Sequence, residues 1–185
     1  YKTFAPGSCG RAALHMEVKI DSPDPENTPG EILARGQNVM LGYYKNEEAT
    51  RQAIDTDGWY HTGDLGTMDS QGNVYIKGRS KNMLLGSNGQ NIYPEEIEDK
   101  LNSMAMVVES IVVQRSDKLV GLVFPDYEEA KDMGLNHDDL ANVMEQNRTA
   151  LNEILPSYSR LAEIEMTEAE FAKTPKKSIK RFLYQ

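Results

Sequence analysis

Cysteine and histidine are both scarce in this sequence. The 185 residues contain a single cysteine, Cys9, which excludes an internal disulfide and suggests a reducing compartment such as the cytoplasm. The three histidines (His15, His61 and His137) are far apart and show none of the spacings typical of metal ligands. We therefore predict no metal site within these residues and a cytoplasmic protein.

Long apolar runs and an excess of positive charge are also missing. No stretch approaches the ~20 apolar residues that span a bilayer, so we do not expect an integral membrane protein. The formal net charge is −9, which argues against nucleic acid as a partner, because a phosphate backbone is bound by a basic surface. One local exception is a basic cluster near the end of the sequence, which is either a solvated tail or an anion site. The cluster consists of Lys173, Lys176, Lys177, Lys180 and Arg181.

The first part of the chain has the alternating apolar pattern of half-buried strands. Leu14, Met16, Val18 and Ile20 occupy every second position, which places them on one face of a strand. Asn46 precedes two glutamates and predicts the N-terminal cap of a short helix. Further strands are predicted at residues 31–35, 65–68 and 74–77. Together these elements predict a small, mostly antiparallel β-subdomain.

The second part of the chain, from about Asn82, mixes helical and strand patterns. Pro94 suits the first turn of a helix, and Asn136 suits the cap of a longer helix that Pro156 ends. Strands are predicted at residues 107–113, 119–124 and 161–166, and a terminal helix at 178–183. This part therefore predicts a compact α+β domain, and the fold class of the whole chain is α+β.

Asp64 and Arg79 lie one β-hairpin apart in the sequence, with a turn and a returning strand between them. A carboxylate can accept both hydroxyls of a ribose, and a guanidinium can bind hydroxyl or phosphate oxygens in a fixed fork. The two side chains on one side of a cleft would suit a nucleotide. Taken alone, each also has an ordinary explanation: an aspartate that follows Gly63 in a turn, and an arginine in a surface ion pair.

Four ordered blocks of sequence resemble the adenylate-forming enzymes, which include acyl-CoA synthetases, firefly luciferase and the adenylation domains of peptide synthetases. The blocks are GEIL through GYY at residues 30–44, YHTGD at 60–64, GRSK at 78–81 and GQNIYPEEIE at 89–98. Each block alone is a weak signal, but four in this order are a strong one. The resemblance covers nearly the whole chain. The chain lacks the phosphate loop that the family places further upstream, so we expect it to be the C-terminal portion of a longer enzyme.

The resemblance implies a two-domain organisation. Residues 1–80 would form the end of the large N-terminal domain, as a small antiparallel β-barrel-like subdomain with the ribose-binding motif. Residues 81–185 would form the mobile α+β C-terminal domain. The family rotates this domain between two reaction steps, and the hinge would be Lys81.

The resemblance also implies substrates and binding residues. The family joins a carboxylic acid to AMP from ATP, then transfers the acyl group to the thiol of CoA. Asp64 and Arg79 would bind the ribose, with Tyr60 and Thr62 from the same motif beside them. Mg²⁺ is expected with ATP, but its ligands would lie outside these residues.

A glycine loop with Gly86, Ser87 and Gly89 would line the channel for the CoA arm. The family ends with Pro-Lys-Thr-x-x-Gly-Lys-x-x-Arg, whose lysine contacts the α-phosphate and the substrate carboxylate. In an ungapped alignment Ser178 falls on that lysine and Lys177 on the glycine before it. A serine cannot supply the charge, so we predict the adjacent Lys177 as the catalytic lysine. Lys176 and Lys180 are the next candidates.

The predicted function is therefore that of an ATP-dependent, AMP-forming acyl-CoA synthetase in fatty-acid metabolism, with a long-chain fatty acid as substrate. Its partners would be small molecules: ATP, a carboxylic acid and CoA. An adenylation domain that loads a carrier protein is one alternative, and a non-catalytic nucleotide-binding homologue is another. These 185 residues alone are predicted to be inactive, because in-line attack requires both substrates to be positioned together.

Overall fold

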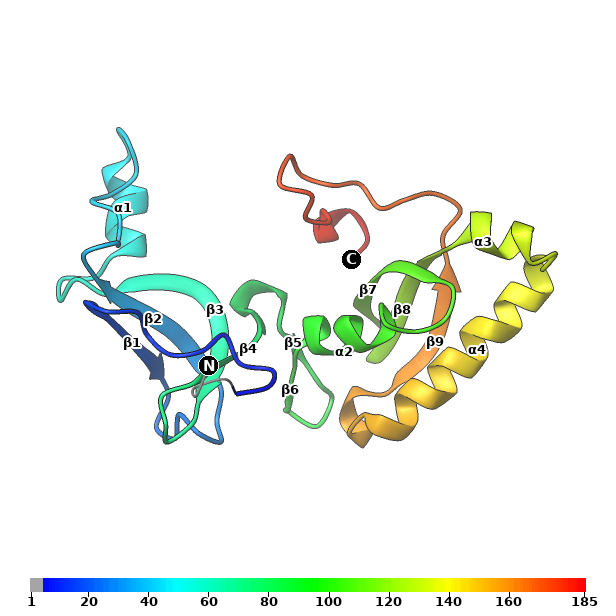
Figure 1. The fold of residues 1–185 in the computed structure, drawn as a ribbon, viewed down its shortest axis with the longest axis horizontal. Helices are drawn as coiled ribbons and strands as arrows, with labels where there is room; N and C mark the ends of the chain where they lie inside the picture. The colour runs from blue at the N-terminus through cyan, green and yellow to red at the C-terminus, as the bar shows by residue number, and fades with distance from the viewer. Residues whose placement is uncertain (1–4) are drawn as a thin grey trace. The chain divides into compact units, whose positions relative to one another are not determined.

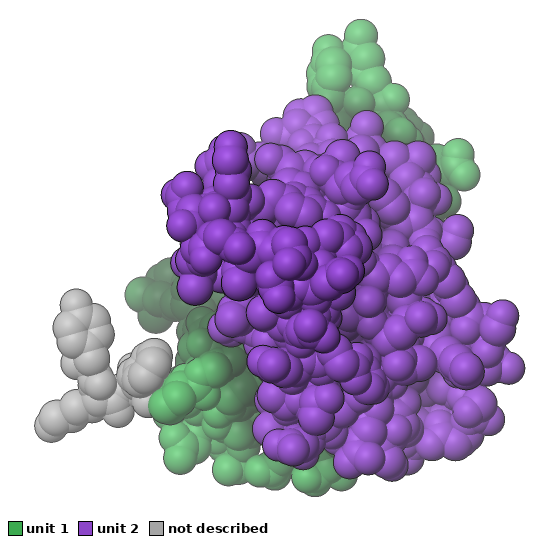
Figure 2. Space-filling view, turned by 90° about the vertical axis from the view of Figure 1, so that its right-hand side faces the viewer, with its two compact units in different colours: residues 1–82 green, residues 83–185 purple. Residues whose placement is uncertain are grey.

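The computed structural model describes residues 5–185, so the first four residues of the predicted β-subdomain lie outside it. The chain folds into two compact units, Tyr1–Asn82 and Met83–Gln185, which Figure 2 shows in different colours. Each unit has its own sheet and its own apolar core. Among the described residues, no helix combines the length and apolarity that crossing a bilayer requires.

The first unit is built on a four-stranded antiparallel sheet with the order β1-β2-β3-β4 (Figure 1). Ile20, Ile32 and Val74 form its small core, with Val18 packed against it. The alternating pattern thus holds for Val18 and Ile20, whereas Leu14 lies before β1 and is exposed. The strands are β1 (Met16–Asp21), β2 (Gly30–Gly36), β3 (Tyr60–Met68) and β4 (Val74–Arg79). Strand β3 begins five residues earlier than predicted, so the whole YHTGD block is strand rather than loop.

The sheet of the first unit is open, and the described part of the unit contains no closed barrel. The prediction of a barrel-like subdomain is therefore corrected in this respect. Barrels with a filled interior have about eight strands, whereas four strands leave β1 and β4 as edges. Helix α1 (Glu47–Ala53) follows β2, and the side chain of Asn46 accepts a hydrogen bond from Ala49 N at 3.0 Å, which confirms the predicted cap.

The second unit starts with a short hairpin and a helix. Strands β5 (Leu84–Leu85) and β6 (Asn91–Ile92) pair antiparallel. Helix α2 (Pro94–Leu101) follows with Pro94 in its first turn, as predicted. Its buried face carries Ile97 and Leu101, which pack in the main core of the unit.

A three-stranded sheet with the order β7-β8-β9 forms the centre of the second unit. Strand β7 (Val107–Arg115) and strand β8 (Lys118–Pro125) form the predicted antiparallel hairpin. Helices α3 (Tyr127–Asp132) and α4 (His137–Ile154) then lead to β9 (Leu161–Met166), which pairs parallel to β8. Asn136 caps α4 in a capping box with Asp139, so the predicted start of this helix is confirmed. A parallel neighbour requires a long crossover connection, which is usually helical, as it is here.

The two faces of this sheet are covered by different parts of the chain (Figure 1). On one face, Val112, Leu119 and Val123 pack with residues of α2 and α4. On the other face, Ile111 and Val113 pack with Phe171, which begins the last part of the chain. We call residues 171–185 the C-terminal arm.

The C-terminal arm is mostly irregular. A helix was predicted at residues 178–183, but only a 3₁₀ turn forms, at Arg181–Leu183. Lys173 instead forms an isolated β-bridge with Ile179, and the turn between them is closed by a hydrogen bond from Thr174 N to Ser178 O at 2.8 Å. Pro175 favours an extended conformation of Thr174 at the start of this turn, because a proline disfavours helical geometry in the residue before it.

Candidate functional site

Asp64 and Arg79 face each other on neighbouring strands β3 and β4 as directly paired residues. Arg79 Nε lies 3.1 Å from Asp64 Oδ1, and Arg79 Nη1 donates a hydrogen bond to Thr62 O at 2.8 Å. The Arg79 side chain is about half exposed, and the Asp64 side chain is about one-third exposed. An ion pair with this exposure contributes little stability, so its geometry matters here mainly because it fixes the orientation of an accessible carboxylate.

Gly63 makes room for the Arg79 guanidinium against the backbone of β3. Its φ is +73°, and a Cβ atom built on it would lie 3.3 Å from Arg79 Nη1. A side chain at this position would therefore combine a strained backbone with crowding against the guanidinium. The glycine of the YHTGD block is thus explained by both conformation and close approach.

Thr62 supports the neighbouring aspartate from within the strand. Its hydroxyl donates to Ile32 O at 2.7 Å and accepts from Asp64 N at 3.1 Å. Burial is the main cause that raises the pKa of the Tyr60 hydroxyl, followed by its hydrogen bond with Tyr43. Tyr60 therefore stays neutral at ordinary pH and keeps its hydrogen-bonding hydroxyl. The structure brings Tyr60, Thr62, Asp64 and Arg79 together, and their role in nucleotide binding stays a prediction.

Glu31 is a further member of this cluster and was not predicted from the sequence. Its Oε1 accepts a hydrogen bond from Gly63 N at 2.9 Å, and its Oε2 lies 2.9 Å from His61 Nδ1. His61 Nε2 lies 3.7 Å from Asp55 Oδ2 on its other side. The hydrogen bond with Glu31 is the main cause that raises the pKa of His61, and Asp55 adds to it. The signal available in the sequence was the position of Glu31 in the GEIL block, in a strand that pairs with YHTGD.

The second group of predicted residues lies in the loop between β5 and β6. Gly86 N donates to Gln90 O at 2.8 Å, and Gly89 N donates to Gly86 O at 2.8 Å, so the loop is a tight turn. Gly89 has a φ of +79°, which favours glycine. Gly86 and Ser87 line a pocket of about 460 Å³, whereas Gly89 is not among its lining residues. Their role beside the CoA arm stays a prediction.

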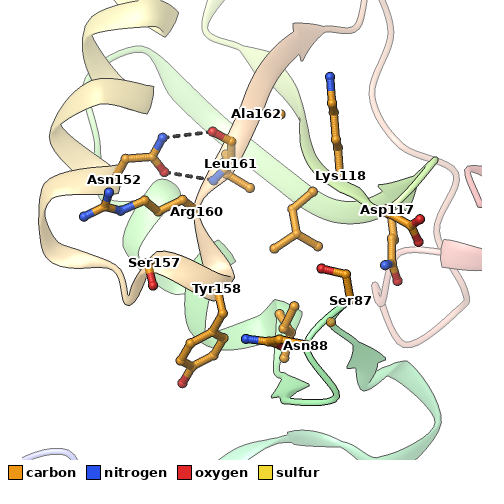
Figure 3. Close-up of a pocket in the computed structure, with 14 residues that line it drawn as sticks. Ser87, Asn88, Asp117, Lys118, Asn152, Ser157, Tyr158, Arg160, Leu161 and Ala162 are labelled. Atoms are coloured by element: carbon orange, nitrogen blue, oxygen red, sulfur yellow. Dashed lines mark hydrogen bonds between the residues drawn. The ribbon is translucent and has the colours of Figure 1, made fainter.

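This pocket is bounded by the loop, the β7–β8 turn, the end of α4 and the start of β9 (Figure 3). Asn152 is used structurally, because it exchanges hydrogen bonds of 2.9 and 2.8 Å with the backbone of Leu161. The two basic residues that line the pocket, Lys118 and Arg160, extend in different directions in Figure 3, upward and to the left respectively. The pocket is therefore polar, but its two cations do not converge on one point.

Lys81, the predicted hinge residue, is exposed and lies in the 3₁₀ turn Ser80–Asn82. The division between the two compact units follows directly after this turn. Its role as a pivot, and the roles of the two parts as an N-terminal remnant and a mobile domain, stay predictions.

Lys177, the predicted catalytic lysine, is exposed at the turn of the C-terminal arm. Its φ is +62°, in the left-handed region that glycine favours, and its backbone N–H donates to Thr174 O at 2.9 Å. This is the position that aligns with the glycine of the family motif. By contrast, Lys173 is held by Glu109 Oε2 at 2.8 Å and Glu170 Oε2 at 3.1 Å, and these contacts raise its pKa.

Over residues 5–185, no group of three or more histidine, cysteine, aspartate or glutamate side chains is arranged to hold a metal ion.

Comparison with known families identifies the fold. Residues 81–184, more than half of the chain, match the AMP-binding enzyme C-terminal domain. The chain belongs to this family. Membership of the adenylate-forming enzymes, predicted from the four sequence blocks, is thereby confirmed.

Curated relatives of this family member are CoA ligases. A 3-[(3aS,4S,7aS)-7a-methyl-1,5-dioxo-octahydro-1H-inden-4-yl]propanoyl:CoA ligase of Rhodococcus jostii is 47% identical over 122 residues, covering 66% of this chain and 22% of that protein. A 2-succinylbenzoate–CoA ligase of Bacillus cytotoxicus is 42% identical over 120 residues, covering 63% and 24%. The chain thus spans about a quarter of the length of these relatives.

A solved structure shares the fold of nearly the whole chain. It is the O-succinylbenzoate coenzyme A synthetase from Bacillus subtilis in complex with AMP, with a TM-score of 0.75 and 25% identity. The match covers 97% of this chain and 35% of that one. It confirms the mixed α+β class with antiparallel strands.

Proposed function

We propose that this chain is the C-terminal part of an ATP-dependent, AMP-forming acyl-CoA synthetase. The observation that carries the proposal is the cross-strand pair of Asp64 and Arg79, with Nε and Oδ1 3.1 Å apart and both side chains partly accessible. The CoA-ligase names of the relatives and the AMP complex of the structural neighbour support the same chemistry.

In this proposal Asp64 accepts the two ribose hydroxyls of the nucleotide. Arg79 holds the carboxylate in place through Nε and binds nucleotide oxygens with its remaining donors. Thr62 and Gly63 fix the strand geometry, and Tyr60 supplies a neutral hydroxyl beside the pair. A carboxylate held in one orientation before binding loses less entropy when the ribose arrives.

The second unit supplies one residue for adenylation and others for the transfer to CoA. Lys177 places a positive charge between the substrate carboxylate and the α-phosphate, which lowers the barrier to their approach. After adenylation the unit changes position about Lys81. The small residues Gly86, Ser87 and Gly89 then allow the CoA arm to pass close to the backbone. Mg²⁺ accompanies ATP and is held by residues outside this chain.

The acid that we propose is a long-chain fatty acid, which would place the enzyme in cytoplasmic lipid metabolism. The support is the resemblance of the GRSKN and GQNIYPEEIE segments to that group of synthetases. The two relatives described above are named for other acids, a bicyclic propanoate and 2-succinylbenzoate. The experiment must therefore compare several acid substrates.

The test is acid-dependent exchange of pyrophosphate into ATP by the full-length protein, with long-chain fatty acids, medium-chain fatty acids and 2-succinylbenzoate. Exchange with a long-chain acid, followed by thioester formation on free CoA, is the expected result. Transfer to a carrier protein but not to CoA would indicate a carrier-loading domain. Exchange with none of the acids would favour a non-catalytic nucleotide-binding protein. The 185 residues alone should give no exchange.

A further inference from the structure

The C-terminal arm is part of the core of the second unit rather than a loose tail. Phe171 is 3% exposed and packs on the face of the sheet formed by Ile111, Val113, Val120 and Leu122. Tyr184 returns to this point, with its ring 5.1 Å from that of Phe171 in an edge-to-face arrangement. Its hydroxyl accepts a hydrogen bond from Ala172 N at 2.8 Å. The beginning and the end of the arm are therefore fastened to each other.

An almost buried ion pair connects the arm to helix α2. Glu98, which is 6% exposed, contacts Arg181 Nη2 through Oε2 and accepts a hydrogen bond from Val112 N through Oε1 at 2.6 Å. The Arg181 side chain is 16% exposed. Burial raises the pKa of Glu98, while Arg181 and the Val112 N–H favour its charged form. One carboxylate thus links the helix, the sheet and the arm.

A second carboxylate holds the other side of the same turn. Glu109 on β7 accepts a hydrogen bond from Phe171 N at 3.0 Å and lies 2.8 Å from Lys173 Nζ. Lys173 forms a β-bridge with Ile179, two residues before Arg181. The exposed turn that carries Lys177 is therefore held at both of its ends by glutamates of the sheet and of α2.

We infer that the Glu98–Arg181 pair is a positioning device, which sets the place of the basic turn at residues 174–178 relative to the body of its unit. This inference rests on the proposed function, in which Lys177 must meet the reacting phosphate. Replacing a buried ion pair by neutral groups is often harmless to stability, whereas removing one partner is costly. The pair is therefore better explained by a need for geometry than by a need for stability, and Glu98 and Arg181 need not contact substrate.

The central experiment uses the double variant Glu98→Gln/Arg181→Met in the full-length enzyme. Glutamine keeps an acceptor for Val112 N, and no buried charge is left without a partner, so the unit should fold. We expect kcat for acyl-adenylate formation to fall by about ten- to a hundredfold, the scale of a small misplacement of a reacting group. The KM for ATP and thioester formation from pre-made acyl-adenylate should stay within about twofold.

Limited trypsin digestion gives a readout that does not depend on activity. The turn contains Lys176 and Lys177, so release of the arm in the double variant should speed cleavage there. Arg181→Lys keeps a cation beside Glu98 and should recover most of the adenylation rate. As a matched control, Arg115→Met breaks an exposed pair with Glu165 that joins β7 to β9, and it should change neither arm cleavage nor adenylation.

Glu98→Asp provides a second test if the double variant does not fold. It keeps a carboxylate near Arg181 but shortens the side chain by one methylene, so one carboxylate can no longer reach both Arg181 and Val112 N, and adenylation should slow selectively by a smaller factor. Wild-type adenylation in the folded double variant, or in Glu98→Asp, would overturn the inference, as would equal loss of both half-reactions in a folded variant. A wild-type enzyme without acid-dependent exchange would instead refute the proposed function, and the trypsin result would still decide whether the pair holds the arm.

Discussion

Replacing Lys177 by glycine separates the charge of this residue from its backbone conformation. Lys177 has a φ of +62° in an exposed turn, a conformation that costs a residue with a side chain about 1 kcal/mol or more relative to glycine. Glycine adopts the same backbone without this strain, although the unfolded chain gains conformational freedom. We expect Lys177→Gly to change the free energy of unfolding by less than about 1 kcal/mol.

The effect on catalysis should be much larger than the effect on stability. A preorganised charge aimed at a developing anionic centre contributes about 3 kcal/mol, which corresponds to a factor on the order of a hundred in rate. Lys177→Gly should therefore slow acyl-adenylate formation about a hundredfold. Transfer to CoA from pre-made acyl-adenylate should be nearly unchanged, because the charge serves only the first step in the proposed mechanism.

The assay is single-turnover formation of acyl-adenylate by the full-length enzyme, with chemical denaturation measured in parallel. Lys176→Ala and Lys180→Ala are the matched controls in the same basic cluster. Each should have a small effect, because a solvated charge away from the reacting atoms acts only through a screened field.

Three outcomes would refute the assignment of Lys177. A full adenylation rate in Lys177→Gly would mean that Lys177 serves only as the counterpart of the family's turn glycine. Similar small losses in all three variants would indicate a diffuse anion-attracting patch. A severe loss in Lys180→Ala alone would show that the alignment of the motif is shifted.

The other predictions concern the first unit and the hinge. Asp64→Asn should weaken AMP binding by about ten- to a hundredfold, the range for a hydrogen bond to a charged group. The control is Asp57→Asn, in an exposed turn. Equal AMP affinities of the two variants, measured by calorimetry, would show that Asp64 does not bind the nucleotide. Lys81→Pro fixes φ and should slow thioester formation while adenylation continues, whereas Lys81→Ala should affect neither; equal loss of both half-reactions would refute the pivot. Because the pKa of His61 is raised, its stabilising contribution should be complete below about pH 6.5 and lost as the pH rises through the raised pKa. The thermal midpoint of wild type should thus exceed that of His61→Gln more at pH 6 than at pH 9, and a constant difference would contradict this.

Local signals in the sequence predicted most of the secondary structure. The caps at Asn46 and Asn136 and the proline at Pro94 each marked a helix start that the structure confirms. These signals work because a cap side chain or a proline acts on its own helix turn. Strands β7 and β8 were equally predictable, since their apolar runs are separated by a short polar turn.

Features that depend on distant residues could not be predicted in the same way. The C-terminal arm was predicted as a helix, but its basic turn is shaped by Glu98 and Glu109, which precede it by more than sixty residues. The support that Glu31 gives to Gly63 depends on the register of β2 against β3, which includes a bulge. Helix α3 was missed because its six residues are too few to show a clear period.

The mixed sheet of the second unit also bears on the order of folding. Strands β7 and β8 are neighbours in the sequence, so their pairing closes only a two-residue loop. Strand β9 pairs with β8 only after α3 and α4 have been crossed, and a longer loop loses more entropy on closure. We therefore expect substitutions in the β7–β8 hairpin to slow folding, and substitutions in β9 or the C-terminal arm mainly to speed unfolding.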